Sequence, residues 1–181
     1  MEKINFIFFG TPHVASDTLE ILFMHGIVPS VIVTSPDRPS GRGMKMTSSP
    51  VKLWADANNI PVLQPEKLDE EFSSNLSRFA CPLAIVVAYG KIIPESIISS
   101  FPKGILNIHY SLLPKYRGAS PVESALLNND QETGITIQKM VYELDAGDIV
   151  SMERVSVMPN DNTTTLRARL IKVGAEILAQ T

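Results

Sequence analysis

The sequence contains very little cysteine: Cys81 is the single one among 181 residues. One cysteine cannot form an internal disulfide, which excludes a disulfide-framed secreted module and fits a reducing compartment. Long apolar runs are also missing, since none approaches the roughly 18 residues that a membrane helix needs, and no signal peptide precedes the first predicted strand. We therefore expect a cytoplasmic protein with no membrane segment.

Positive charge is not in excess either. Lys and Arg together number 16 against 19 Asp and Glu, which gives a formal net charge of −3. This balance provides no global basic field for nucleic acid, so any such contact must come from a local patch. Hydrophobic residues make up 44% of the chain, and its length suits one domain that folds without disulfides or metals.

Strands and helices are predicted to alternate along the chain. The run from Ile4 to Phe9 is apolar and β-rich, apolar residues follow Thr11 at helical spacing up to Gly26, and Val28 to Thr34 is apolar again. This βαβ unit has strands that are apolar on both faces, as a parallel sheet covered by helices requires. The alternation predicts an α/β fold with a Rossmann-like, open, mainly parallel sheet and helices on both faces. Further helices are predicted at 51–58, 69–79, 94–99, 120–127 and 163–178, further strands at 83–88 and 104–109, and a hairpin from 134–140 and 148–157.

Several common signatures are missing from the sequence. A dinucleotide-binding loop would show G-x-G-x-x-G after the first strand, but Gly10 stands alone there, and no P-loop sequence occurs. No cluster of His and Cys has the spacing of a zinc site, so we expect no metal. No internal repeat, low-complexity tract or interdomain linker is seen, so residues 1–181 are expected to form one domain.

Polar residues concentrate in the stretch G-I-L-N-I-H-Y-S-L-L-P-K-Y-R-G-A-S from Gly104 to Ser120. Because side chains alternate along a strand, Asn107 and His109 are predicted to share one face near its carboxyl end, where ligands of open α/β sheets bind. The Asn107 amide can donate to a carbonyl oxygen that becomes negative, and the His109 imidazole can exchange a proton near neutral pH. Asp145, on a glycine-bearing loop, could reach the histidine and stabilise its charged form. This combination favours acyl transfer, although singly each residue is compatible with a cap, a core histidine or a turn aspartate.

The same stretch resembles the signature of folate-dependent formyltransferases, together with E-T-G-I-T-I from Glu132 and L-D-A-G-D-I from Leu144. In that family an Asn, a His and an Asp form the catalytic trio, which implies that Asn107, His109 and Asp145 are catalytic. The segments F-F-G-T-P at 8–12, S-P-D-R-P-S-G-R-G at 35–43 and V-V-A-Y-G at 86–90 are similar to the branch of the family that acts on methionyl-tRNA. The resemblance covers essentially the whole chain.

The resemblance implies that a formyl group moves from 10-formyltetrahydrofolate to the α-amino group of methionine on initiator tRNA. The folate is a cosubstrate that is spent in each turnover, and no metal is implied. The folate contacts that the resemblance implies are Ser111, Leu112, Leu113 and Pro114 in one stretch and Ala88, Tyr89 and Gly90 in another.

The resemblance also implies that the loop from Ser35 to Thr47 enters the acceptor end of the tRNA. Composition alone favours a solvated flexible loop. A local basic loop on an acidic protein can contact phosphate without a general affinity for nucleic acid. The basic residues in question are Arg38, Arg42 and Lys45, with Lys115 and Arg117 as an extension.

Members of this branch carry a second, smaller β-barrel domain after the catalytic one, and nothing like it follows within these residues. We therefore expect residues 1–181 to be the catalytic domain of a longer protein, acting as a monomer, with weakened tRNA binding. Three alternatives stay open. A phosphoribosylglycinamide formyltransferase would have a first loop rich in glycine, unlike Gly10 to His13. A sugar-nucleotide formyltransferase would differ in its amine acceptor, and a folate- or RNA-binding module without activity would not need the trio.

Overall fold

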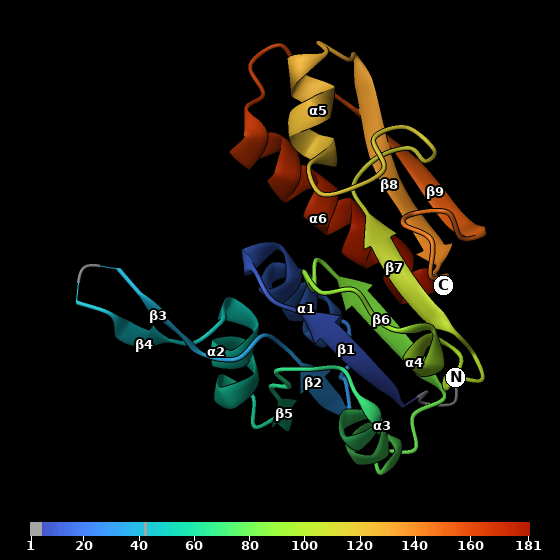
Figure 1. Cartoon of the computed structure of the whole chain (residues 1–181). Coiled ribbons are helices and arrows are strands. Elements are labelled where there is room, and N and C mark those ends of the chain that lie inside the picture. The colour runs from blue at the N-terminus through green and yellow to red at the C-terminus, as the bar shows by residue number, and fades with distance from the viewer. Residues whose placement is uncertain (1–4, 42) are drawn as a thin grey trace. The chain divides into compact units, whose positions relative to one another are not determined.

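The computed structural model of the chain describes residues 5–41 and 43–181, and its helices and strands alternate as the apolar runs predict (Figure 1). The described residues form two units, one made of the segment up to Ser16 with Val28–Ile105, the other of Asp17–Ile27 with Leu106–Thr181. The strands are β1 (Phe6–Gly10), β2 (Val31–Val33), β3 (Arg38–Ser40), β4 (Lys45–Thr47), β5 (Val62–Leu63), β6 (Leu83–Val87), β7 (Ile105–His109), β8 (Glu132–Lys139) and β9 (Ile149–Ser156). The helices are α1 (His13–Met24), α2 (Pro50–Ala57), α3 (Glu70–Ser77), α4 (Glu95–Ile98), α5 (Pro121–Leu127) and α6 (Thr163–Gln180).

Parallel strands form the sheet of the first unit, in the order β5-β2-β1-β6. Phe8 of β1 lies opposite Ile32 of β2 and Ile85 of β6. All residues of β1 and β2 are buried, which explains why these strands are apolar without alternation. Gly10 ends β1 where a Cβ would lie 2.7 Å from the Cβ of Ala15, so the close passage of the chain into α1 requires glycine.

The second unit contains an antiparallel sheet in the order β7-β8-β9. The predicted hairpin is its β8–β9 pair, and β8 is buried from Thr133 to Gln138. β9 is mostly exposed and pairs with β8 on one side only, within the described residues. Helix α6 packs on the sheet at Gly174, where a Cβ would lie 3.3 Å from a methyl group of Ile108 of β7 and 3.5 Å from one of Ile135 of β8, so the small residue allows close packing.

The structure differs from the sequence-based elements at two places. Residues 38–40 and 45–47 pair as the antiparallel strands β3 and β4, where composition alone favours a flexible loop. Gly41 and Gly43 have φ angles of 70° and 105°, which let the chain reverse between two short strands. β5 was not predicted because two residues are too few to show a hydrophobic period. None of the helices within residues 5–41 and 43–181 is long and apolar enough to span a bilayer.

An aspartate fixes the start of α6. The carboxylate of Asp161 is 3% exposed and accepts hydrogen bonds from Arg169 Nη1 at 2.7 Å, from Thr165 Oγ1 at 2.8 Å and from the Met158 amide at 2.7 Å. Arg169 also donates through Nη2. These donors, with Arg169 as the largest influence, hold the pKa of Asp161 well below its ordinary value of 3.8.

Asp161 is therefore expected to make the protein sensitive to acid. A carboxyl whose pKa is lowered by folding contributes stability above its unfolded pKa and loses it as the pH falls toward the folded value. Asp161→Asn should lower the melting temperature at about pH 7 and should flatten its decline between about pH 4 and pH 2. Thermal unfolding followed by circular dichroism measures both effects, with Asp56→Asn, an exposed aspartate of α2, as the control. An identical acid response in wild type and Asp161→Asn would contradict the assignment.

Candidate active site

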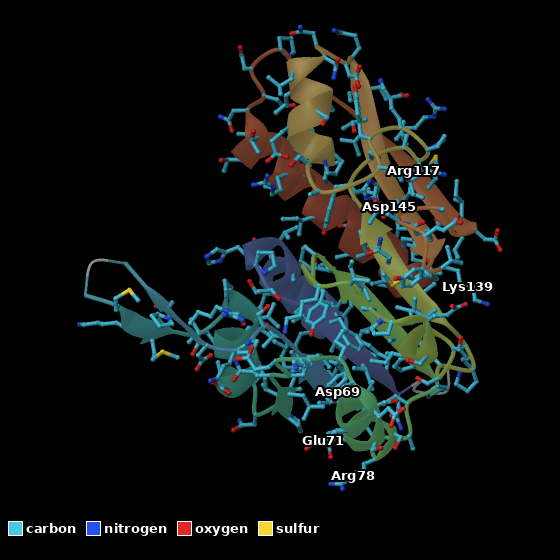
Figure 2. All side chains as sticks on the ribbon, in the orientation of Figure 1. Asp69, Glu71, Arg78, Arg117, Lys139 and Asp145 are labelled. Carbon is cyan, nitrogen blue, oxygen red and sulfur yellow. The ribbon has the colours of Figure 1, made fainter. Side chains whose placement is uncertain are left out.

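The structure brings Asn107, His109 and Asp145 together in the second unit. Asn107 and His109 lie two residues apart on β7, and Asp145 lies on the loop between β8 and β9 (Figure 2). Asn107 Nδ2 is 3.5 Å from Asp145 Oδ1, and His109 Nδ1 is 3.5 Å from Asp145 Oδ2. The side chains of His109 and Asp145 are only 7% and 8% exposed, so this contact is shielded from bulk water.

The carboxylate of Asp145 faces two donors on each oxygen. Besides Asn107, Oδ1 accepts from Gln138 Nε2 at 2.9 Å, and besides His109, Oδ2 accepts from the Gly118 amide at 2.8 Å. Asp145 has a φ angle of 48°, in the left-handed region that few residues other than glycine adopt. Such strain persists only where the surroundings determine the conformation, and the four donors provide those surroundings.

Gln138 belongs to this site, although the sequence analysis did not single it out. It lies opposite Asn107 on β8, next to an irregularity in the β8–β9 register, and it is 2% exposed. Its Nε2 donates to Asp145 while its Oε1 accepts from the Gly147 amide at 3.2 Å. One buried amide therefore fixes the loop at two points. The available signal was a long polar side chain inside the apolar run of β8.

The other side of the His109 ring contacts a backbone carbonyl. His109 Nε2 lies 2.9 Å from the Tyr116 carbonyl oxygen, so the ring has an acceptor at each nitrogen. An imidazole that carries a proton on both nitrogens satisfies both acceptors. Asn107 and His109 thus place an amide and an imidazole beside one another, an arrangement suited to an oxygen that becomes negative during a reaction.

The stretch Ser111–Pro114 follows β7 directly and is built into the second unit. Ser111 is fully buried, and its hydroxyl donates to the Lys115 carbonyl. Thr136 Oγ1 donates to the Ser111 carbonyl at 2.7 Å and accepts from the Leu113 amide at 3.1 Å. These groups hold the shape of the stretch, while Leu112 is partly exposed and Pro114 is exposed.

Ala88, Tyr89 and Gly90 lie in the first unit, at the carboxyl end of β6. Ala88 and Gly90 have φ angles of 47° and 82°, so the chain turns sharply there. The Tyr89 ring packs edge-on against Phe9, with 5.4 Å between centroids, and its carbonyl accepts from Thr11 Oγ1 at 2.9 Å. The Tyr89 hydroxyl is buried and has no hydrogen-bond partner among the described residues, and burial raises its pKa to about 12.

Two of the basic residues predicted to contact tRNA lie on the β3–β4 hairpin of the first unit. Arg38 of β3 and Lys45 of β4 are exposed, and Arg38 pairs with Glu66 at 3.3 Å. Arg42 lies outside the described residues. Beside the hairpin, Asp37 accepts from Lys52 Nζ at 2.6 Å and from Gln64 Nε2 at 2.8 Å, and these donors hold the pKa of Asp37 below its ordinary value.

Lys115, predicted to extend the basic patch, is paired with an acidic residue. Lys115 of the second unit donates to Asp130 at 2.7 Å, so its ammonium group is held by a carboxylate rather than left uncompensated. Within residues 5–41 and 43–181, no three or more His, Cys, Asp or Glu side chains are grouped so that they could hold a metal ion.

Comparisons with known proteins point to one family. The family model described as "Formyl transferase" matches residues 2–181. The methionyl-tRNA formyltransferase of Buchnera aphidicola subsp. Schizaphis graminum is 43% identical over 182 residues, which cover 100% of this chain and 58% of that protein. The methionyl-tRNA formyltransferase of Koribacter versatilis is 45% identical over 177 residues, which cover 97% and 57%. The chain thus spans a little more than half the length of these relatives.

Solved structures agree with the predicted fold. A phosphoribosylglycinamide formyltransferase from Bacillus halodurans superposes with a TM-score of 0.78 at 20% identity, over 97% of this chain and 91% of that chain. A formyltetrahydrofolate deformylase from Pseudomonas syringae gives a TM-score of 0.76 at 19% identity, over 99% and 60%. At this identity the likeness concerns the fold alone, and it confirms the predicted α/β class.

Proposed function

Since this chain belongs to the formyl transferase family, we propose that it moves the formyl group of 10-formyltetrahydrofolate to the α-amino group of methionine on initiator tRNA, for translation initiation. The observation that carries the proposal is the convergence of Asn107, His109 and Asp145 in one shielded place. The acceptor is proposed from the relatives that are 43% and 45% identical.

The proposed reaction exchanges one bond to the formyl carbon for another. The methionine amine attacks the formyl carbon, and the bond between that carbon and the folate nitrogen breaks. The amine loses one proton, and the folate nitrogen gains one. Negative charge develops on the formyl oxygen, where the Asn107 amide would donate, and where a protonated His109 would donate through Nε2 once that N–H leaves the Tyr116 carbonyl. Asp145 keeps the imidazole oriented through Nδ1.

We propose that the folate contacts Ser111–Pro114 in the second unit and Ala88–Gly90 in the first. Pockets for such ligands are mostly apolar with a few polar groups. Leu112 and Pro114 are the members of the first stretch with accessible surface, while Ser111 and Leu113 use polar groups to hold its shape. The buried Tyr89 hydroxyl is a polar group in the second stretch without a partner in the described residues.

We further propose that Arg38, Arg42 and Lys45 contact the phosphates of the tRNA acceptor end. Arg38 and Lys45 are exposed, and the ion pair of Asp37 with Lys52 gives the start of the hairpin a defined attachment. Such phosphate contacts position a nucleic acid without reading its bases.

A formylation assay tests the proposal. The chain is incubated with 10-formyltetrahydrofolate and methionyl-tRNA, and in parallel with glycinamide ribonucleotide and with an amino-sugar nucleotide. Transfer to the tRNA that Asn107→Ala abolishes and Asn75→Ala, a matched change on α3, preserves would support both acceptor and site. Donor hydrolysis that depends on Asn107, without transfer, would support the chemical centre and leave the acceptor unsupported. Transfer to another amine would overturn the acceptor, and no turnover of the donor in any mixture would overturn the proposal for this chain.

A further inference from the structure

A short turn at residues 116–118 supports the catalytic trio through its backbone. The Tyr116 carbonyl lies 2.9 Å from His109 Nε2, and the Gly118 amide donates to Asp145 Oδ2 at 2.8 Å. Tyr116 and Gly118 both have left-handed φ angles, 57° and 103°, and Arg117 lies between them in the chain. The turn contributes only backbone atoms to these two contacts. The position of the turn therefore determines where the Tyr116 carbonyl and the Gly118 amide contact His109 and Asp145.

An acidic residue outside the trio anchors this turn. Asp130 follows α5, and its side chain is 16% exposed. Its Oδ2 accepts from Lys115 Nζ at 2.7 Å and from the Tyr116 hydroxyl at 2.8 Å. The Lys115 ammonium group also lies 4.9 Å from the centre of the Tyr116 ring. Lys115, which precedes the turn, and Tyr116, its first residue, therefore both donate to one carboxylate, and these hydrogen bonds are charge-assisted.

The anchoring residues are themselves held in the second unit. The Lys115 amide donates to the Leu112 carbonyl at 3.0 Å, and the Asp130 amide donates to the Ala125 carbonyl at 3.0 Å. The backbone on both sides of the Asp130 contact is thus fixed. A continuous series of contacts runs from Asp130 through Tyr116 to His109, and through the turn to Gly118 and Asp145.

We infer that Asp130 is a positioning residue: it holds the 116–118 turn so that the Tyr116 carbonyl and the Gly118 amide fix the orientation of His109 and Asp145. The kinetic consequence of this inference rests on the proposed function, whereas its structural consequence does not. A carboxylate that only stabilised the fold would change the melting temperature and would leave the His109 ring as it is.

Nuclear magnetic resonance of the histidine rings tests the structural consequence without any substrate. The chain has three histidines, His13, His25 and His109, so their ring signals can be assigned by single substitutions. Asp130→Asn should shift the ring nitrogen signals and the titration midpoint of His109, speed the exchange of its Nε2 proton, and leave the other two histidines unchanged. Glu132→Gln, which breaks an exposed ion pair with Arg154 in the same unit, is the matched control and should change none of these signals.

Two further variants keep the test decisive. Tyr116→Phe removes only the hydroxyl that donates to Asp130 and should shift the His109 signals in the same direction. This variant tests the inference if Asp130→Asn does not fold. Asp130→Glu should restore part of the wild-type spectrum. Unchanged His109 signals in folded Asp130→Asn, or in Tyr116→Phe, would overturn the inference.

The kinetic arm separates this inference from the proposed function. If the chain transfers formyl groups, Asp130→Asn should lower kcat by about tenfold and leave KM for both substrates within about twofold, because misplaced catalytic groups slow the chemical step. An equal loss in Glu132→Gln would count against positioning. His109 signals that respond to Asp130 in a protein that turns over no formyl donor would overturn the proposed function and sustain the positioning role.

Discussion

Asp145→Asn is expected to lower the rate of formyl transfer by about 10²- to 10³-fold, the range found when a group that stabilises developing charge is lost. The substitution keeps the size of the side chain and replaces one oxygen by an NH₂ group. In the structure, Oδ1 faces the NH₂ groups of Gln138 and Asn107, whereas Oδ2 faces the Gly118 amide and His109 Nδ1. Whichever way the new amide turns, its NH₂ group meets at least one N–H donor. Asparagine therefore cannot reproduce the wild-type contacts.

Single-turnover formylation combined with thermal unfolding separates a chemical loss from a general loss of structure. Asp148→Asn is the matched control, because Asp148 lies three residues away on the same loop and its side chain is exposed. We expect near wild-type rates for that control. A folded Asp145→Asn protein with a wild-type rate would show that the carboxylate has no part in catalysis.

Gly147→Ala is expected to destabilise the protein by about 3 kcal/mol, at the upper end of the cost of overpacking. A Cβ at Gly147 would lie 1.8 Å from the Lys139 carbonyl oxygen and 2.9 Å from the Lys139 carbonyl carbon. Both atoms belong to the backbone of β8, so no side chain can rotate away to make room. The loop must move instead. It carries Asp145 and also the Gly147 amide, which donates a hydrogen bond to Gln138 Oε1. Activity should fall together with stability.

Chemical denaturation measures the free energy of unfolding of this variant. Gly26→Ala is the control, because a Cβ there meets nothing within 4 Å and only the left-handed φ angle of 76° opposes it. The control should cost about 1 kcal/mol, the backbone strain alone. Equal destabilisation in the two variants would show that the loop near Gly147 yields easily and that close approach is not the reason for glycine there.

Local patterns predicted the parts of the fold that depend on local physics. The apolar runs of β1 and β6 and the helical spacing of α6 identify these elements, since burial on two faces or on one stripe is visible in the sequence itself. The pairing of Asn107 with His109 on one face also follows from alternation along β7 alone. By contrast, the β3–β4 hairpin depends on a turn whose glycine conformations composition does not specify.

The surroundings of Asp145 could not be predicted, because they arise from contacts between distant segments. Gln138 reaches Asp145 only through the register of β7 against β8, which places it opposite Asn107. The Gly118 amide reaches the same carboxylate only because two residues of the 116–118 turn adopt left-handed conformations. Residue type indicated which side chains can take part in catalysis. Strand register and turn geometry decide which other residues position those side chains.

The one-sided pairing of β9 has a practical consequence for handling this chain in concentrated solution. An exposed strand edge offers unpaired backbone groups to a second molecule, and natural edges often carry charges that oppose such pairing. Glu153 and Arg154 supply exposed charges in the second half of β9, whereas Ile149 and Val150, about half exposed, leave its first half apolar. Self-association at high concentration should therefore begin at the first half of β9, and Val150→Lys should suppress it.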